Sequence, residues 1–102
     1  SDGVEGLAVA YAKTSISDQA LEILKLMEAN ESEYFLLSNE LSKVRRLVLC
    51  PGPNHLCEES RFLQDDLQLM TDLGLLVVRH NPKGDPMYCY TRAASKLLQS
   101  LQ

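Results

Sequence analysis

The sequence predicts an α+β fold that is mostly helical and carries a small sheet. Three observations lead to this prediction. Apolar residues recur at steps of three or four in several segments, which is the period of a helix. Two short runs of β-branched and aromatic residues, 75–79 and 87–91, flank a stretch rich in turn residues. Polar residues that suit helix N-caps, such as Ser17 and Thr91, precede helical patterns. We expect residues 1–16 to form an N-terminal segment and residues 17–102 to form one domain.

The N-terminal segment has the pattern of a short helix over residues 4–13. Val4, Leu7, Ala8 and Tyr11 would form one apolar stripe. A lone helix of this length is marginal in water, so it needs a surface to pack on. We expect that surface to be the domain or a second copy of the chain, which makes Leu7 and Tyr11 candidate protein contacts.

The next helix should begin after Ser17 and end at Asn30. Asp18 and Glu22 suit the positive end of the helix dipole. Asn is a common residue where a helix stops. Leu21 and Leu24 belong to its broad apolar face.

Residues 33–37 suit a brief strand, and Ser38 then resembles the N-cap of a second helix. In that helix Leu41, Val44 and either Leu47 or Val48 would face inward. Two prolines at residues 51–53 cannot continue a helix, so we expect this one to end before them.

A third helix is predicted from a cap at Asn54 to a stop at Gly74, which would adopt the left-handed conformation. Its inward stripe would consist of residues spaced three or four apart, namely Leu56, Ser60, Leu63, Leu67 and Met70. The two runs that follow should form a β-hairpin, with Tyr88 and Tyr90 on one face. Thr91 would then cap a last helix. We expect the core to contain Leu21, Leu24, Leu41, Leu63, Leu67, Met70, Leu76 and Leu97.

This order of elements resembles the winged-helix superfamily of helix-turn-helix domains. The likeness rests on the spacing of Leu67, Met70 and Leu73 before Gly74, and on the Thr after the hairpin. It covers residues 17–101 and implies a three-helix core, a β-hairpin wing and a closing C-terminal helix. The connection at residues 49–54 departs from the pattern, because it holds two prolines and exceeds the tight turn of a standard helix-turn-helix. Such folds serve many functions, so the resemblance implies little about activity.

Charge favours a protein partner over DNA. The net charge is −4, and between Asn54 and Gly74 five acids stand against one Arg. Acids on a recognition helix oppose the electrostatic attraction that supplies much of DNA affinity. We expect a non-enzymatic regulatory or adaptor module of a larger protein that contacts a protein partner, another domain or a second copy as a homodimer. Besides Leu7 and Tyr11, the candidate contacts are Glu58, Arg61, Asp65, Gln68 and Asp72.

The alternative is a DNA-binding domain of a transcriptional regulator. Bases near the end of the second helix and in the wing would contact the phosphate backbone or a minor groove. The residues for this role are Lys43, Arg45, Arg46, Arg61, Gln64, Arg79, His80 and Lys83.

Enzymatic, metal and cofactor sites find little support in the sequence. It contains no nucleophile elbow, phosphate loop or metal-binding helix motif. The adjacent acids Glu58 and Glu59, and likewise Asp65 and Asp66, would point about 100° apart on a helix and could not form a catalytic pair, so we expect them to be solvated helix surface. Cys50 and Cys57 are too far apart in sequence for a paired zinc ligand, and no second pair exists. Three cysteines without a disulfide-scaffold pattern favour a reducing compartment, so we expect a cytoplasmic protein. We expect no contact with a membrane, since no run approaches the roughly 20 apolar residues of a span.

Overall fold

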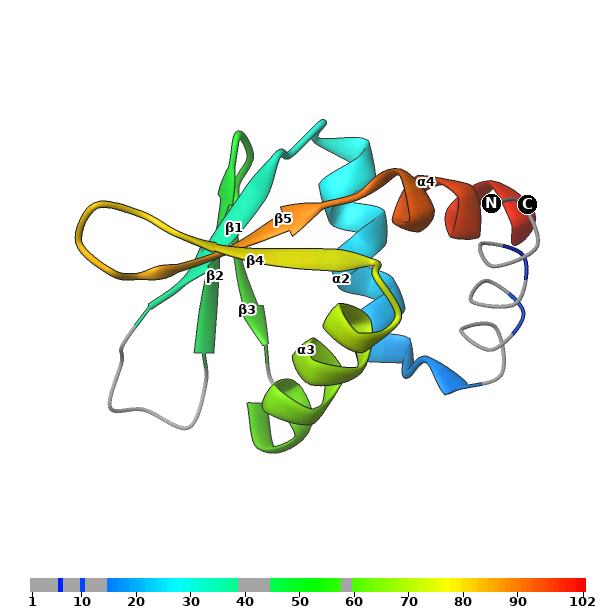
Figure 1. The fold of residues 1–102 in the computed structure, drawn as a ribbon, viewed down its shortest axis with the longest axis horizontal. Helices are drawn as coiled ribbons and strands as arrows, with labels where there is room; N and C mark the ends of the chain where they lie inside the picture. Colours follow the sequence, from blue (N-terminus) through cyan, green and yellow to red (C-terminus); the bar gives the residue numbers. More distant parts are fainter. Residues whose placement is uncertain (1–5, 7–9, 11–14, 39–44, 58–59) are drawn as a thin grey trace.

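The structure, a computed structural model, describes residues 6, 10, 15–38, 45–57 and 60–102. Within these residues the chain is α+β, with three α-helices, a 3-10 turn and a five-stranded antiparallel sheet (Figure 1). The elements in chain order are α2 (Asp18–Ala29), β1 (Tyr34–Leu37), β2 (Arg45–Cys50), β3 (Asn54–Cys57), η1 (Ser60–Phe62), α3 (Leu63–Asp72), β4 (Leu76–His80), β5 (Pro86–Tyr90) and α4 (Arg92–Ser100).

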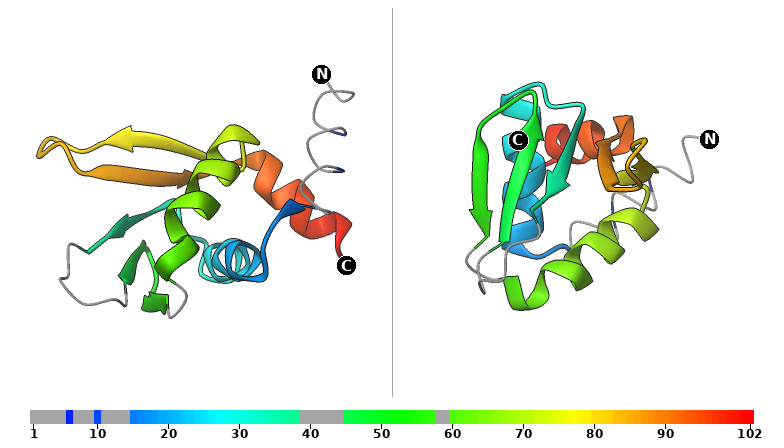
Figure 2. Two further views of the ribbon diagram at one scale, coloured as in Figure 1. Left: turned by 90° about the horizontal axis from the view of Figure 1, so that it is seen from below. Right: turned by 90° about the vertical axis from the view of Figure 1, so that its left-hand side faces the viewer.

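The strands lie in the order β3-β2-β1-β5-β4, so β1 is central and β3 and β4 are the edges. β1 pairs with β2 along its whole length, from Tyr34 opposite Cys50 to Leu37 opposite Leu47. It pairs with β5 only at Tyr34 and Phe35, after which the two strands diverge. The hairpin of β4 and β5 therefore runs across the direction of β2 and β3 and projects from the domain (Figures 1 and 2). The described helices cover one face of the sheet (Figure 2).

α2 has the ends that the sequence predicts. The Ser17 hydroxyl accepts a hydrogen bond from the backbone N–H of Ala20 at 3.0 Å, which satisfies one of the first unpaired amides of the helix. Asn30 is the C-cap, and its side-chain amide donates to the carbonyl of Leu26 at 2.8 Å. The face between these caps is buried over Ile23 and Leu24.

The prediction of a second helix is wrong for residues 45–50, which the structure describes. Arg45–Cys50 is strand β2, which pairs with β1 on one side and β3 on the other. Leu47 and Leu49 are buried and Val48 between them is not, which is the two-residue period of a strand. Ser38 does not act as a helix cap toward this segment, because its hydroxyl accepts from the amide of Arg46.

Residues 51–53 connect two strands instead of two helices. The Cys50–Pro51 peptide is cis, and Gly52 has a φ of +144°. A Cβ at position 52 would lie 2.9 Å from the Cβ of Leu49, so both the backbone angle and the space favour glycine there. The β2–β3 hairpin gives the sheet five strands, where the sequence predicted one brief strand and one hairpin.

α3 is shorter than predicted at its start. Asn54 begins β3 instead of capping a helix, and Leu56 is 54% exposed instead of buried. The helix proper begins at Leu63, after η1, and no side chain caps it. The predicted stripe of Leu63, Leu67 and Met70 is buried.

The last third of the chain agrees closely with the prediction. Gly74 follows α3 with a φ of +73°, and the β4–β5 hairpin pairs from Leu76 opposite Tyr90 to His80 opposite Pro86. Thr91 caps α4 by accepting from the amide of Ala94 at 3.2 Å. The same hydroxyl is placed to donate to the carbonyls of Gly74 at 2.7 Å and Leu75 at 2.9 Å, and so ties α4 to the start of β4.

The core lies between the sheet and the three helices. Six of the residues predicted for it are buried, namely Leu24, Leu63, Leu67, Met70, Leu76 and Leu97. Leu21 is partly buried and packs against this cluster, and Leu41 lies outside the described residues. The core also contains Phe35, Leu47 and Leu49. Of these, the helix predicted after Ser38 offered only Leu47 as a possible inward residue.

Candidate protein-contact surface

The outward side of α3 is a polar surface opposite the buried stripe. Because Leu63, Leu67 and Met70 recur at steps of three and four, they share one side of α3, and the residues on the opposite side face solvent. The exposed side chains are those of Gln64, Asp65, Gln68 and Asp72. Gln68 donates to the Asp72 carboxylate at 2.8 Å, which orders the last turn of this surface.

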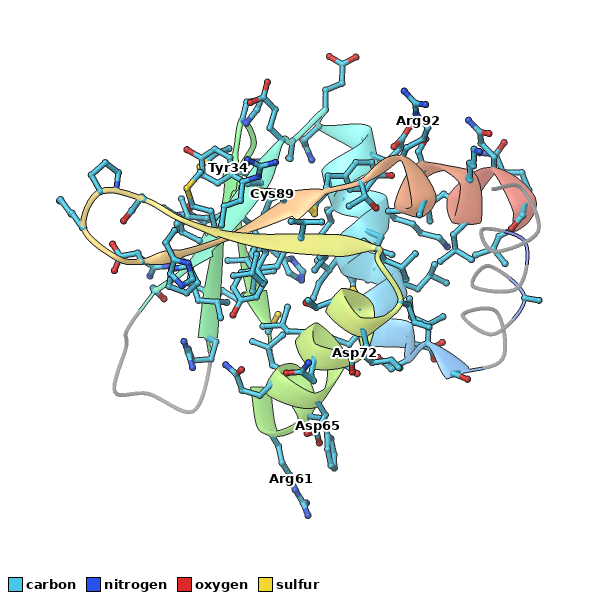
Figure 3. The ribbon with its side chains drawn as sticks, viewed as in Figure 1. Tyr34, Arg61, Asp65, Asp72, Cys89 and Arg92 are labelled. Atoms are coloured by element: carbon cyan, nitrogen blue, oxygen red, sulfur yellow. The ribbon has the colours of Figure 1, made fainter. Side chains whose placement is uncertain are left out.

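An aromatic ring stands at the beginning of this surface. Phe62 is 48% exposed, although it directly precedes the fully buried Leu63. The guanidinium carbon of Arg61 lies 4.9 Å from the centre of the Phe62 ring, a cation–π arrangement. Arg61 and Asp65 project away from the domain at the free end of α3 (Figure 3). Phe62, Arg61, Gln64, Asp65, Gln68 and Asp72 are called the α3 surface below.

A hollow of about 380 Å³ adjoins the α3 surface where α2 and α3 begin. It is lined by Ser17, Gln19, Phe62, Asp65 and Asp66. Phe62 and Asp65 thus belong to both the hollow and the α3 surface, so an apolar ring and a carboxylate are presented side by side. This combination suits an apolar side chain accompanied by a cation.

Asp65 and Asp66 differ sharply, although the sequence indicated solvated helix surface for both. Asp65 is exposed, whereas Asp66 is only 8% exposed and accepts a hydrogen bond from the side-chain amide of Gln19 at 3.0 Å. The prediction for Asp66 was therefore wrong. Its carboxylate joins α3 to α2 and belongs to the structural support of the surface.

The charge of this region remains acidic in the structure. From Ser60 to Asp72, one arginine stands against three aspartates, two of which are exposed. Glu58, a predicted contact, and Glu59 lie outside the described residues. The same is true of Leu7 and Tyr11, so the N-terminal contact stays a prediction.

A smaller groove of about 110 Å³ separates α3 from the β4–β5 hairpin. It is lined by Gln64, Leu67, Gln68, Thr71, Val78 and Tyr88. The Tyr88 ring stacks on Phe35, with centroids 5.0 Å apart and 16° between the planes. Tyr90 points to the same face, and its hydroxyl donates to Glu28. Both rings are therefore engaged within the domain.

The bases proposed for DNA contact are scattered. Arg45 and Arg46 are consecutive strand residues and point to opposite faces of β2, not along one side of a helix. Arg79 and His80 are exposed on β4, and Lys83 is exposed in the turn after it. Arg79 shares a face with Arg46, but β1 and β5 separate their strands, a distance of about 14 Å across the sheet. Arg61 lies at the α3 end, and Lys43 lies outside the described residues.

The cysteines do not form an evident reactive centre. All three are free. Cys57 is buried, and desolvation, followed by the nearby Glu22 and Asp66 carboxylates, raises its pKa to about 11, so the thiol is neutral at ordinary pH. Cys50 and Cys89 are register partners of Tyr34 on either side of β1, which places them two strand spacings, about 10 Å, apart. That separation exceeds the reach of a disulfide.

In the part of the chain that the structure describes, no three His, Cys, Asp or Glu side chains gather as a metal site would require. None of the described helices has both the length and the apolar character needed to cross a membrane. No known protein family matches the chain, and no curated protein or solved structure is similar to it.

Arg61, Asp65, Gln68 and Asp72 are all exposed on the α3 surface, and their contact with a partner stays a prediction. The surface also includes Phe62, which the sequence analysis missed. The sequence did hold a signal for Phe62. A large apolar residue one position before the buried stripe of a helix lies beside the inward face and is therefore partly exposed.

Proposed function

We propose that the domain is a non-enzymatic interaction module of a larger protein and binds a protein partner through the α3 surface. The observation that carries this proposal is the half-exposed ring of Phe62, which stands beside the exposed carboxylate of Asp65. Burial of an aromatic ring at an interface is a frequent source of binding energy, and nearby charges give orientation and specificity.

The chemistry of the surface indicates the chemistry of the partner. Phe62 and the hollow beside it need an apolar group to exclude water. Asp65 and Asp72 lie two helical turns apart and favour lysine or arginine on the partner. We therefore expect a partner segment with an apolar side chain flanked by cations.

We further propose that the domain is a variant of the winged-helix arrangement. In this interpretation α2, β1, α3, the β4–β5 hairpin and α4 keep their expected order, and the β2–β3 hairpin takes the place of the second helix. That replacement removes the first helix of a helix-turn-helix, which normally crosses the DNA backbone. The DNA-binding alternative then rests on Arg79, His80 and Lys83 of the projecting hairpin.

The proposal is tested by comparing four forms of the immobilised domain in one capture experiment. These are wild type, Phe62→Ala, the double variant Asp65→Lys and Asp72→Lys, and Leu101→Ala. Leu101 is also an exposed apolar residue but lies at the far end of α4, so it serves as the matched control. We expect a protein retained by wild type and the Leu101 variant to be lost from both α3 variants. Equal retention by all four forms would contradict the proposal.

A further inference from the structure

β4 is an edge strand with exposed apolar residues. Among the residues that the structure describes, it pairs with β5 alone. Val77 is 44% and Val78 36% exposed, and they point to opposite faces of the sheet. In Figure 1 β4 is the foremost strand of the sheet, and no described helix lies in front of its free edge.

The hydrogen bonds show which backbone groups of β4 face that free edge. The amide of Tyr90 donates to the carbonyl of Glu33 at 2.8 Å, so the backbone of Tyr90 faces β1 and not β4. Its register partner Leu76 therefore has its N–H and C=O directed away from β5. Because the pattern alternates along an antiparallel ladder, Val78 and His80 also direct their N–H and C=O groups away from β5. Val77 and Arg79 form backbone hydrogen bonds with β5.

Two further observations agree with this assignment. The residue opposite His80 is Pro86, which has no N–H to offer to β4. Asn81 lies two residues after Arg79, so by the same alternation its amide should point across the hairpin. It donates to the carbonyl of Asp85 at 3.0 Å. The free edge therefore presents three N–H and three C=O groups, from Leu76, Val78 and His80.

Little in β4 protects this edge from another strand. Natural edges are usually protected by proline, lysine, a bulge or a covering element. β4 contains neither proline nor lysine, and its five residues pair with β5 without a bulge. Its charged side chain is Arg79, next to the end of the strand.

The groove beside β4 could receive a side chain from an added strand. Val78 points to the face of the sheet that carries α3, where it lines the groove of about 110 Å³ with Gln64, Gln68 and Thr71. The residue opposite Val78 on a strand added to this edge would point to the same face. Its side chain would then enter the groove, which has room for a small aliphatic group.

We propose that β4 pairs antiparallel with β4 of a second copy, so that one sheet runs through a two-fold symmetric dimer. Val78 then lies opposite Val78 of the second copy, and each valine enters the groove of the other. Leu76 lies opposite His80, and Val77 lies opposite Arg79. Such an isologous interface uses the same patch on both copies.

Charge and overlap select this register. A shift in one direction places Arg79 opposite Arg79 of the second copy, and like charges directly opposite are destabilising. A shift in the other direction leaves His80 without a strand residue opposite it. The register centred on Val78 keeps all five residues of β4 paired and places no two like charges opposite each other. It also lets every N–H and C=O of Leu76, Val78 and His80 that faces the edge form a hydrogen bond with the second copy. This dimer goes beyond the proposed function. It uses the groove side of α3, at Gln64 and Gln68, whereas Phe62 and Asp65 line the separate hollow and stay outside the dimer interface.

Sedimentation velocity of the full chain tests the proposal, over concentrations from about 10 μM to about 1 mM. We expect a reversible monomer–dimer equilibrium. Val78→Lys places two ammonium groups opposite each other and should weaken the dimer about tenfold or more. Leu56→Lys is the matched control, because it changes an exposed apolar residue on the other edge strand, and it should leave the dimer unchanged. Val78→Pro removes an N–H that β5 does not use, so it should abolish the dimer while the hairpin stays folded.

Amide hydrogen exchange locates the interface independently. Protection of the Val78 and His80 amides should rise with protein concentration, whereas the Val77 and Arg79 amides should be protected at every concentration. Phe62→Ala should leave the dimer intact, so failure of the α3 proposal and failure of this one are distinguishable. A chain that stays monomeric throughout, a dimer that tolerates Val78→Lys, or concentration-dependent protection confined to other elements would overturn the proposal.

Discussion

The side-chain amide of Gln19 donates a 3.0 Å hydrogen bond to the carboxylate of Asp66, 47 residues later in the chain. The bond joins the first turn of α2 to the first turn of α3, and both of its residues line the hollow together with Phe62 and Asp65. A buried carboxylate needs hydrogen-bond partners that replace the water it has lost. The orientation of the α3 surface therefore depends on a residue that is not itself exposed.

Replacement of Asp66 should destabilise the domain. We expect Asp66→Ala to lower the free energy of unfolding by roughly 1–3 kcal/mol, because it leaves Gln19 without this acceptor in a part-buried site. Asp66→Asn should lose less stability, since its amide oxygen can still accept the hydrogen bond from Gln19. The exposed Asp65→Ala is the control and should change stability by no more than about 0.5 kcal/mol. Equal effects at positions 65 and 66 in urea denaturation would contradict the difference in burial.

Truncation of Leu67 tests the buried stripe of α3. Leu67 is 2% exposed at the centre of that stripe, so Leu67→Ala should cost roughly 2–4 kcal/mol by leaving a cavity. Gln64, almost one turn earlier on the same helix, is exposed, and Gln64→Ala should remain within about 0.5 kcal/mol of wild type. A thermal melt unchanged by Leu67→Ala would mean that another face of the helix is buried.

The pH dependence of stability should carry a contribution from Cys57. Its pKa is raised from 9.0 to about 11 in the folded chain, so the unfolded chain ionises first as the pH rises. The stabilisation from the neutral buried thiol is fully present below pH 9 and is lost as the pH climbs toward about 11. Burial and the bond to Glu28 raise the pKa of Tyr90 as well, so a smaller alkaline loss should persist in Cys57→Ala. The free energy of unfolding, measured by denaturation across this pH range, should fall less steeply for Cys57→Ala than for wild type. Identical slopes would refute the contribution assigned to Cys57.

Binding to random duplex DNA should be weak, at roughly 10⁻⁴ M or weaker at physiological salt, because Asp65 and Asp72 repel phosphates. Replacing both with lysine should improve binding at low salt. Fluorescence anisotropy at two salt concentrations measures both expectations. Tight and salt-sensitive binding to a specific duplex, lost when Arg79 and Lys83 become alanine, would instead support the DNA-binding alternative.

Sequence alone determined the elements that are defined by local signals. Ser17 and Thr91 cap their helices as predicted, and Asn30 and Gly74 end theirs, because each acts on backbone groups within a few residues. The β4–β5 hairpin was predictable for the same reason. Asn81 accepts from the amides of Lys83 and Asp85, so the turn is closed by its own residues.

Only the tertiary structure decided the state of Arg45–Cys50. Leu47 and Val48 fit the inward positions of a helix that starts at Ser38, while Leu47 and Leu49 fit a strand equally well. Strand formation depends on β1 and β3 supplying hydrogen-bond partners on both sides. Those partners are brought by the packing of Phe35, Leu47 and Leu49 against the helices, which is absent from any local window.

The same limit applies to the candidate site. Helical spacing places Asp66, three residues after Leu63 and four before Met70, on the side of the buried stripe, and it places Asp65 off that side. No local rule, however, could identify Gln19, 47 residues earlier, as the partner of Asp66. Nor could the sequence place Val78 beside α3, or show that no described strand pairs with the outer edge of β4. Helix caps and turns are fixed by short-range hydrogen bonds, whereas burial and strand neighbours depend on contacts between distant segments, which exist only once the core has formed.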